Sequence, residues 1–379
     1  MTTMAIDNKE KEVLNVPPLR FPEFTGEWQC KAIEKVAPLQ RGFDLPTQNL
    51  VEGIYPVIYS NGILQHHDKY KCEAPGLITG RSGTIGKFTY IDSGFYWPHN
   101  TSLWVTDFCG NCPKFIYYLY QTVHIEQFST GSGVPTLNRN DVHRYKTSVP
   151  TAIVEQEKIA KFLSILDERI VTQNKIIEDL NKLKSAIIEM EYTHKTKGNT
   201  HIGDFIEQTS KRNKDSAIQN VLSVSNSQGF IQQCEQFENR SVASDDISNY
   251  KIVERNCFAF NPARINVGSI ARLTTFNRGI VSPMYICFRT KDNLFPEYLD
   301  YYFESKQFFT EIQKRLEGSV RQCLSYEGLC NIPLCIPTVE VQQQTGKRLS
   351  TLVQEIKLEI DFLELLQKQK KFLLHQMFI

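Results

Sequence analysis

The residues that first suggest chemistry are the glycines of the stretch GRSGTIGKF (80–88), because glycines beside a lysine can cradle a phosphate. A phosphate loop has four residues between its first two glycines, and its lysine is followed by a Ser or Thr that holds magnesium. In this sequence five residues separate Gly80 from Gly86, and Phe88 follows the lysine. We therefore interpret the glycines as permitting a sharp turn. That turn would present the polar side chains of Arg81, Ser82 and Thr84.

Other motifs that could bind a metal or support catalysis are incomplete. Cys109 and Cys112 form one Cys-x-x-Cys pair with His99 upstream, but no second pair completes a zinc site. The ten cysteines are scattered, so we expect reduced thiols. The stretch NPAR (261–264) lacks the second proline and the aromatic residue that amino-methyltransferases use to hold a flipped base. With no HExxH, GxSxG or nuclease carboxylate cluster, the sequence predicts no enzyme, no metal and no cofactor.

The composition is that of an ordinary globular protein. The 379 residues allow two or three domains, with 41% hydrophobic and 22% charged residues. No apolar run approaches the roughly 18 residues that span a bilayer. The N-terminal stretch MTTMAIDNKEKEV has no apolar core after its charges, so we expect no signal peptide and a flexible tail at 1–16. These features predict a cytoplasmic protein without a membrane segment.

The formal net charge of +1 gives no global field that would attract nucleic acid. Duplex binding depends on neutralising phosphates, so this charge argues mildly against a DNA-binding protein that acts alone. It leaves room for local basic loops, or for a partner that supplies further charge.

The sequence repeats itself at an offset of 186 to 187 residues, about half the chain. Pro150 and Thr151 match Pro337 and Thr338, and the segments that follow share apolar, Ser and Lys positions. An aromatic segment precedes each copy, PKFIYYLY (113–120) and PEYLDYYF (296–303). The chain is therefore ordered as globular unit, long helix, globular unit, long helix.

Both long segments have apolar residues at heptad spacing, and neither Pro nor Gly interrupts 158–192 or 347–379. A helix of about 38 residues is about 57 Å long, more than a small domain can cover. We expect the two helices to form an antiparallel pair, with an apolar stripe wide enough to accept another protein's helices. The alternative, that each helix covers only its own globular unit, stays open.

Each globular unit contains short β-type runs broken by Gly, Ser and Arg turns, such as 76–97 and 258–288. We expect a mixed sheet with one or two helices in each unit, and functional residues in the loops. The predicted fold class is α+β, with two mixed α/β domains in a pseudo-two-fold repeat, separated by two long antiparallel coiled-coil helices. The expected divisions are a tail at 1–16, domains at 17–150 and 196–337, and helices at 151–195 and 338–379.

This order of motifs resembles the specificity (S) subunit of type I restriction-modification enzymes over almost the whole chain. The resemblance rests on RFPEFTGEW (20–28), GRSGTIGK (80–87), NPARINVGSI (261–270), EGSVRQCLS (317–325) and, above all, PTAIVEQEKIAKFLSILDERI (150–170) with its C-terminal copy. Each motif is loose, but their order and the half-chain repeat are specific.

The resemblance implies that each globular unit is a target recognition domain for one half of a bipartite, asymmetric sequence in double-stranded DNA. It also implies that the long helices are the spacer and dock two methyltransferase (M) subunits, which restriction (R) subunits then join. S-adenosylmethionine and the restriction nucleotide would belong to those partners. Two other classes stay open, a metal-dependent nuclease and a coiled-coil adaptor that binds only proteins.

The resemblance further implies which residues contact DNA and which contact partners. In the first domain the DNA-contacting residues are Ser60, Asn61, Arg81, Ser82, Thr84, Val134, Pro135 and Thr136. In the second they are Ser225, Asn226, Arg264, Asn266, Ser269, Ser319, Arg321 and Gln322. The partner-binding residues are Leu163, Leu166, Ile170, Ile177, Leu180, Leu349, Leu352, Ile356, Leu363 and Leu366.

Overall fold

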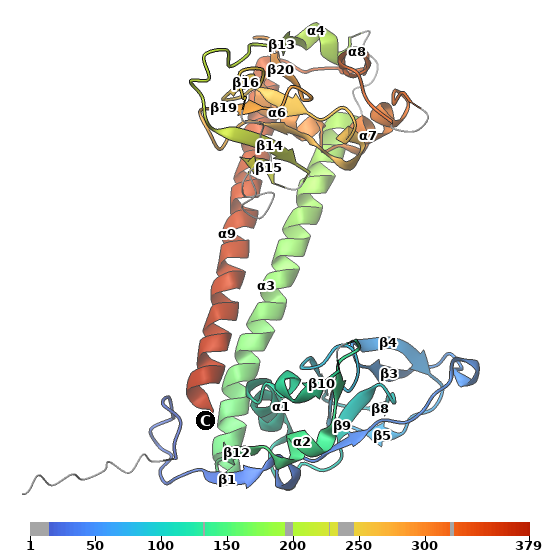
Figure 1. The fold of residues 1–379 in the computed structure, drawn as a ribbon, viewed down its shortest axis with the longest axis vertical. Coiled ribbons are helices and arrows are strands. Elements are labelled where there is room, and N and C mark those ends of the chain that lie inside the picture. The colour runs from blue at the N-terminus through green and yellow to red at the C-terminus, as the bar shows by residue number, and fades with distance from the viewer. Residues whose placement is uncertain (1–14, 132, 194–199, 227, 234–245, 319–321) are drawn as a thin grey trace, which may run out of the picture. The chain divides into compact units, whose positions relative to one another are not determined.

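The computed structural model describes residues 15–131, 133–193, 200–226, 228–233, 246–318 and 322–379 (Figure 1). The chain divides into two compact units. Unit 1 contains residues 1–174 and 362–379, and unit 2 contains residues 175–361. Both long helices therefore contribute residues to both units.

Two four-stranded sheets form the body of unit 1. One has the order β2 (Leu39–Arg41), β9 (Ser102–Val105), β6 (Gly76–Gly80), β7 (Phe88–Ile91). The other has the order β4 (Gly62–His67), β3 (Tyr55–Tyr59), β8 (Phe95–Pro98), β5 (Cys72–Glu73). Strands β3 and β8 pair in parallel, whereas the other pairs in these sheets are antiparallel.

Smaller elements surround these sheets. They are β1 (Gln29–Ala32) paired with β12 (Lys146–Val149), β10 (Ser129–Thr130) paired with β11 (Thr136–Leu137), and the helices η1 (Ile33–Lys35), η2 (Thr47–Asn49), α1 (Pro113–Thr122), η3 (Ile125–Phe128) and α2 (Arg139–Arg144). Helix α1 begins with a proline, which suits a first helical turn. Its buried Phe115, Ile116 and Leu119 form the centre of the core of this unit.

Unit 2 repeats the same two sheets. Their orders are β13 (Ile206–Thr209), β20 (Ile286–Thr290), β17 (Phe258–Phe260), β18 (Ile270–Arg272) and β15 (Gly229–Gln232), β14 (Val221–Ser225), β19 (Arg278–Val281), β16 (Lys251–Glu254). Its shorter helices are α4 (Ile202–Phe205), η4 (Ile265–Val267), α6 (Pro296–Tyr302), α7 (Lys306–Gln313) and α8 (Tyr326–Cys330).

Strands β13 to β20 thus pair as β2 to β9 do, and the one parallel pair, β14 with β19, occupies the same place as β3 with β8. The predicted repeat and the α+β class are therefore confirmed. The expectation of one mixed sheet in each unit was wrong. The turn pattern of the sequence locates strands, but it does not tell which strands pair, and here the chain passes from one sheet to the other.

The long helices are α3 (Ile153–Thr193) and α9 (Val339–Met377). In unit 1 the first part of α3 packs with the last part of α9: Leu166, Leu366 and Leu373 belong to one core cluster, and Asp167 and Lys370 form an ion pair of 2.6 Å. In unit 2 the end of α3 packs against the beginning of α9, with Ile188, Tyr192 and Leu349 in one cluster. The helices therefore pair antiparallel, as expected. None of the helices in the described ranges has the length and apolar character needed to cross a bilayer.

Gly346 lies inside α9, which runs through it without a break. A Cβ atom at this position would lie 3.2 Å from the Cβ of Glu297 in α6. The glycine therefore permits a close approach between α9 and its own domain, and this packing offsets its low helix propensity.

A buried glutamine joins each long helix to its domain. The Gln156 amide oxygen accepts a hydrogen bond from Cys112 N–H, and its amide nitrogen donates to the carbonyl oxygen of Pro150 and to Asn111 Oδ1, all at 2.9 Å. Gln342 does the same one repeat later, since its oxygen accepts from Phe295 N–H at 2.8 Å and its nitrogen donates to the carbonyl oxygens of Pro337 and Asn293.

Gln342→Ala should therefore lower the free energy of unfolding by several kcal/mol, because each buried polar group left without a partner costs about 1–3 kcal/mol. Gln156→Ala should have an effect of similar size. Gln354→Ala, at an exposed position of α9, is the control and should change stability by less than about 0.5 kcal/mol. Denaturant unfolding of the full chain measures all three. A Gln342→Ala variant as stable as Gln354→Ala would show that the hydrogen bonds of Gln342 do not hold α9 to its domain.

Candidate nucleic-acid interface

Three loops meet at one end of unit 1. The loop between β6 and β7 is bonded to the β10–β11 hairpin through Gly83 N–H to the Pro135 carbonyl at 3.0 Å and through a bridge between Ser82 and Thr136. On its other side, Lys87 Nζ donates to the Asn61 carbonyl in the β3–β4 turn at 3.1 Å. The structure thereby brings together the first-domain residues that the sequence predicted, Ser60, Asn61, Arg81, Ser82, Thr84, Val134, Pro135 and Thr136.

At three positions of this loop a side chain would clash or strain the backbone, which explains the glycines. A Cβ atom on Gly80 would lie 1.6 Å from the Thr84 carbonyl oxygen, so no other residue fits there. Gly83 and Gly86 have φ values of +81° and +84°, in the left-handed region that favours glycine. The sharp turn inferred from the sequence is thus the reason that Arg81 and Ser82 are held at the domain end.

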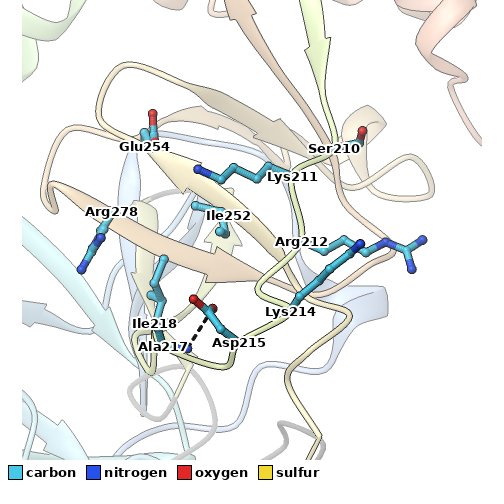
Figure 2. A pocket seen from close by; sticks show the side chains of 10 residues that line it. All are labelled: Ser210, Lys211, Arg212, Lys214, Asp215, Ala217, Ile218, Ile252, Glu254 and Arg278. Carbon is cyan, nitrogen blue, oxygen red and sulfur yellow. Dashed lines mark hydrogen bonds between the residues drawn. The ribbon is translucent and has the colours of Figure 1, made fainter.

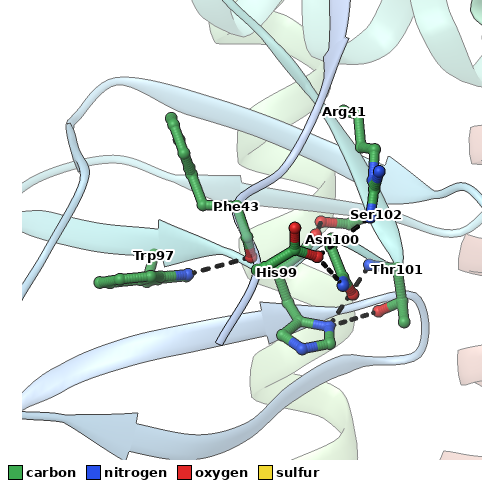
Figure 3. Close-up of polar contacts among 8 residues, drawn as sticks. Arg41, Phe43, Trp97, His99, Asn100, Thr101 and Ser102 are labelled. Atoms are coloured by element: carbon green, nitrogen blue, oxygen red, sulfur yellow. Dashed lines mark hydrogen bonds and ion pairs between the residues drawn. The ribbon is translucent and has the colours of Figure 1, made fainter. Parts of the chain in front are cut away.

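A fourth turn at this end, residues 99–101, was missed by sequence reasoning (Figure 3). The Thr101 carbonyl accepts from Arg81 N–H at 2.9 Å, so the turn supports the loop directly. His99 Nδ1 lies 3.0 Å from Thr101 Oγ1, and Asn100 donates to Asp44, which also pairs with Arg41 at 3.0 Å. The only sequence signal was a short polar turn, His-Asn-Thr, between two apolar runs.

Unit 2 has the corresponding loops. The segment 261–269 is closed on itself by Asn261 N–H to the Ser269 carbonyl at 3.0 Å and Arg264 N–H to the Asn261 carbonyl at 3.0 Å. The segment after α7 joins it through Leu324 N–H to the Pro262 carbonyl at 3.0 Å. The side chains of Asn226, Arg264, Asn266 and Gln322 are exposed on these loops, and Ser225 is half-buried.

Ser269 does not fit the predicted DNA-contacting role. It is 4% exposed, and its hydroxyl donates to the Val224 carbonyl at 3.1 Å. Its side chain therefore joins the loop to strand β14 and has no surface to offer a ligand. Ser319 and Arg321, also predicted to contact DNA, lie outside the described residues.

Unit 2 also has a hollow of about 780 Å³ lined by residues of both charges (Figure 2). It lies at the strand ends opposite to those that carry the predicted loops. Its cationic residues are Lys211, Arg212, Lys214 and Arg278, and its acids are Asp215 and Glu254. Arg278 begins β19 and lies opposite Glu254, whereas the predicted loops follow the far ends of β14 and β17. The hollow is therefore separate from the loop cluster.

The predicted partner-binding residues mostly face inward. Six of the ten are buried in the chain itself, namely Leu163, Leu166, Leu349, Leu352, Ile356 and Leu366. The other four, Ile170, Ile177, Leu180 and Leu363, are half-buried. The six buried side chains pack inside the chain and leave little area for a second protein, so a docking role for this set stays a prediction.

Other apolar residues of the helices are exposed instead, and they recur at multiples of seven. On α9 these are Leu358, Leu365 and Phe372, followed by Ile379 just after the helix, with exposed fractions from 49% to 68%. On α3 they are Phe162, Ile176, Leu183 and Met190, with exposed fractions from 40% to 58%. Lines of exposed apolar side chains of this kind are typical of protein-binding surfaces.

The cysteines offer no evident metal site. Cys109 and Cys112 lie in the turn before α1. Within the described ranges, no group of three or more His, Cys, Asp or Glu residues is arranged to hold a metal ion.

Comparison with known proteins gives a family model and a fold. Residues 25–182 match the family model described as the type I restriction modification DNA specificity domain. No protein with a curated description matches the chain by sequence.

Two solved structures share the fold across nearly the whole chain. One, the crystal structure of a type I restriction-modification system S subunit from M. genitalium, has a TM-score of 0.64 and 17% identity, and the match covers 96% of this chain and 99% of that one. Another comes from a study of complex assembly and conformational transition of the type I R-M system, with a TM-score of 0.54, 13% identity and coverage of 92% and 96%.

Two histidines near the loops of unit 1 should make its stability depend on pH. Burial lowers the pKa of His99 and of His143 below the ordinary value of 6.5. The unfolded chain then binds protons more readily than the folded chain, so stability is full above about pH 6.5 and is lost as pH falls below it. His143 Nε2 also accepts the Leu39 N–H at 2.8 Å.

In His143→Gln an amide oxygen can accept that hydrogen bond without titrating. We therefore expect the free energy of unfolding to fall less between pH 7.5 and pH 5 in this variant than in the unchanged chain. Denaturant unfolding at the two pH values measures the difference. Equal losses in both proteins would exclude His143 as a source of the pH dependence.

Proposed function

We propose that the chain is the specificity subunit of a type I restriction-modification system, and that each of its two domains reads one half of a bipartite target in double-stranded DNA. In this role it recognises the DNA sequence for the system and is not itself an enzyme. The observation that best supports two separate readers is that the same three-loop cluster recurs on the same strand topology with different side chains.

The loop side chains are suited to base recognition in the major groove. Arg81 and Arg264 can make bidentate hydrogen bonds to guanine, and Asn61, Asn226 and Gln322 can do so to adenine. Among the described residues, no hydrogen bond or ion pair occupies the guanidinium group of Arg81 or Arg264. Both groups are therefore free to bind a base edge or a phosphate.

The helices are proposed to dock the methyltransferase subunits. The exposed heptad-spaced lines on α3 and α9 support this, because apolar side chains with these exposed fractions gain free energy when a partner helix covers them. Two M subunits, one for each half of the repeat, and then R subunits would complete the complex. These partners would supply the methyl donor and the restriction nucleotide, and the complex would act on DNA in the cytoplasm.

A double substitution tests the docking surface. Leu358→Asp with Leu365→Asp should abolish co-purification with a co-expressed M subunit, while the free energy of unfolding changes little, because both side chains are exposed. Leu352→Asp is the matched comparison on the same helix. Since Leu352 is 8% exposed, a charge there should lower the stability of the chain itself. Retention of the M subunit by the double variant would mean that the partner binds elsewhere.

Substitution of the two loop arginines tests the division into two readers. Arg81→Ala should weaken recognition of one half-site by roughly 1–3 kcal/mol if the contact is to a base. Arg264→Ala should do so at the other half-site. Mapping of genomic methylation in cells that carry each variant with its partner subunits shows which base positions relax. Relaxation of the same positions by both variants would refute the two-domain division.

A further inference from the structure

Three arginines, one of them the loop residue Arg81, surround a hollow of about 610 Å³ at the loop end of unit 1. Arg41 comes from the end of β2, Arg81 from the β6–β7 loop and Arg139 from the first position of α2. Leu103 and Leu137, both nearly fully buried, also line it. Three cationic side chains from three separate elements thus converge on one concave surface.

The hollow lies at the loop end of the domain. Arg41 pairs with Leu103 at the start of β9, directly after the 99–101 turn, and Leu137 N–H donates to the Arg81 carbonyl at 2.8 Å. The arginines are therefore within the same group of hydrogen-bonded segments as the predicted base-reading residues.

The charge in the hollow is mostly uncompensated. Asp44 is the one acid that lines it, and its carboxylate is already shared between Arg41 and the amide of Asn100. Among the described residues neither Arg81 nor Arg139 forms a side-chain hydrogen bond or an ion pair. Cations left without partners in an open hollow favour an anion that arrives from solution.

We propose that this hollow binds phosphodiester groups of the duplex beside the first half-site, with Arg139 and Arg41 as the phosphate contacts. The inference rests on the proposed function and adds phosphate contacts from Arg41 and Arg139, which lie outside the loops from which bases are read. Contacts of this kind fix the position of a protein on DNA and are indifferent to sequence. The hollow would thus hold the backbone while Arg81, which also lines it, is presented to the bases.

The test is a salt titration of DNA binding by the full chain purified with its M subunit. Two duplexes are used, one with the target found by methylation mapping and one with its first half-site scrambled. Each phosphate contact that is lost should reduce the slope of log affinity against log salt by about 0.9. We expect Arg139→Ala to do so and to weaken both duplexes by the same factor. Arg41→Ala should act in the same direction, and Arg139→Lys should restore the slope.

Two controls remove the same charge elsewhere. Arg144 lies on α2 but outside the hollow and pairs with Asp141, and Arg278 lines the separate hollow of unit 2. Arg144→Ala and Arg278→Ala should leave the slope unchanged. Arg139 is exposed, so thermal unfolding of Arg139→Ala should match that of the unchanged chain.

The outcomes separate this inference from the proposed function. If the unchanged complex binds both duplexes equally, the proposed recognition function fails. If it discriminates between them but Arg139→Ala keeps the full slope, the phosphate site is wrong. Selective weakening of the intact target alone would likewise overturn the inference, because it would make Arg139 a reader of bases.

Discussion

Each of the two domains depends on a buried glutamine that fixes its long helix. Gln156 and Gln342, both at most 1% exposed, satisfy a backbone N–H at the start of an aromatic helix and the carbonyl of the proline before the long helix. A buried amide has few alternative partners, so this geometry is strongly specified. The helix direction relative to its own domain follows from it, and the same joint occurs twice at the repeat offset.

The end of the other helix completes each domain in an equivalent way. Phe378 of the C-terminal segment stacks on Phe115 at 5.3 Å in unit 1, and Tyr192 of α3 lies 4.9 Å from Tyr298 in unit 2. Lys370 pairs with Asp167 near Tyr118, and Lys184 pairs with Glu304 near Tyr301. Each domain is therefore packed by the start of one long helix and the end of the other. An antiparallel pair can pack both domains in this way because each of its ends consists of the start of one helix and the end of the other.

The fold was more predictable from the sequence than the site, and particular residues show why. Heptad spacing and the repeated Pro-Thr identify α3 and α9, because a long helix needs a continuous apolar stripe that survives in sequence. The stripe does not reveal that Leu166 packs inside the chain while Phe162 stays exposed, since both are apolar and only four residues apart. Ser269 was misjudged, and the turn that contains Asn100 was missed, for a similar reason. Whether a polar loop residue bonds to its own backbone or faces solvent is decided by strands distant in sequence.

The arginines explain how a chain with a net charge of +1 can bind a polyanion. Several arginines are held by acids of the chain, as Arg20 is by Glu155 at 2.7 Å and Arg272 by Asp300 at 3.1 Å. Such pairs fix structure and contribute little long-range field.

Arg81, Arg139 and Arg264 have no side-chain partner among the described residues, and all three lie at the loop ends of their domains. Positive charge is thereby concentrated where the loops meet, while the chain as a whole stays nearly neutral. Screening over about 8–10 Å at physiological salt makes such local charge more important to a bound duplex than the total. On the proposed function, such a chain gains most of its affinity for DNA where a duplex lies against its loops, which favours discrimination between sequences over indiscriminate binding.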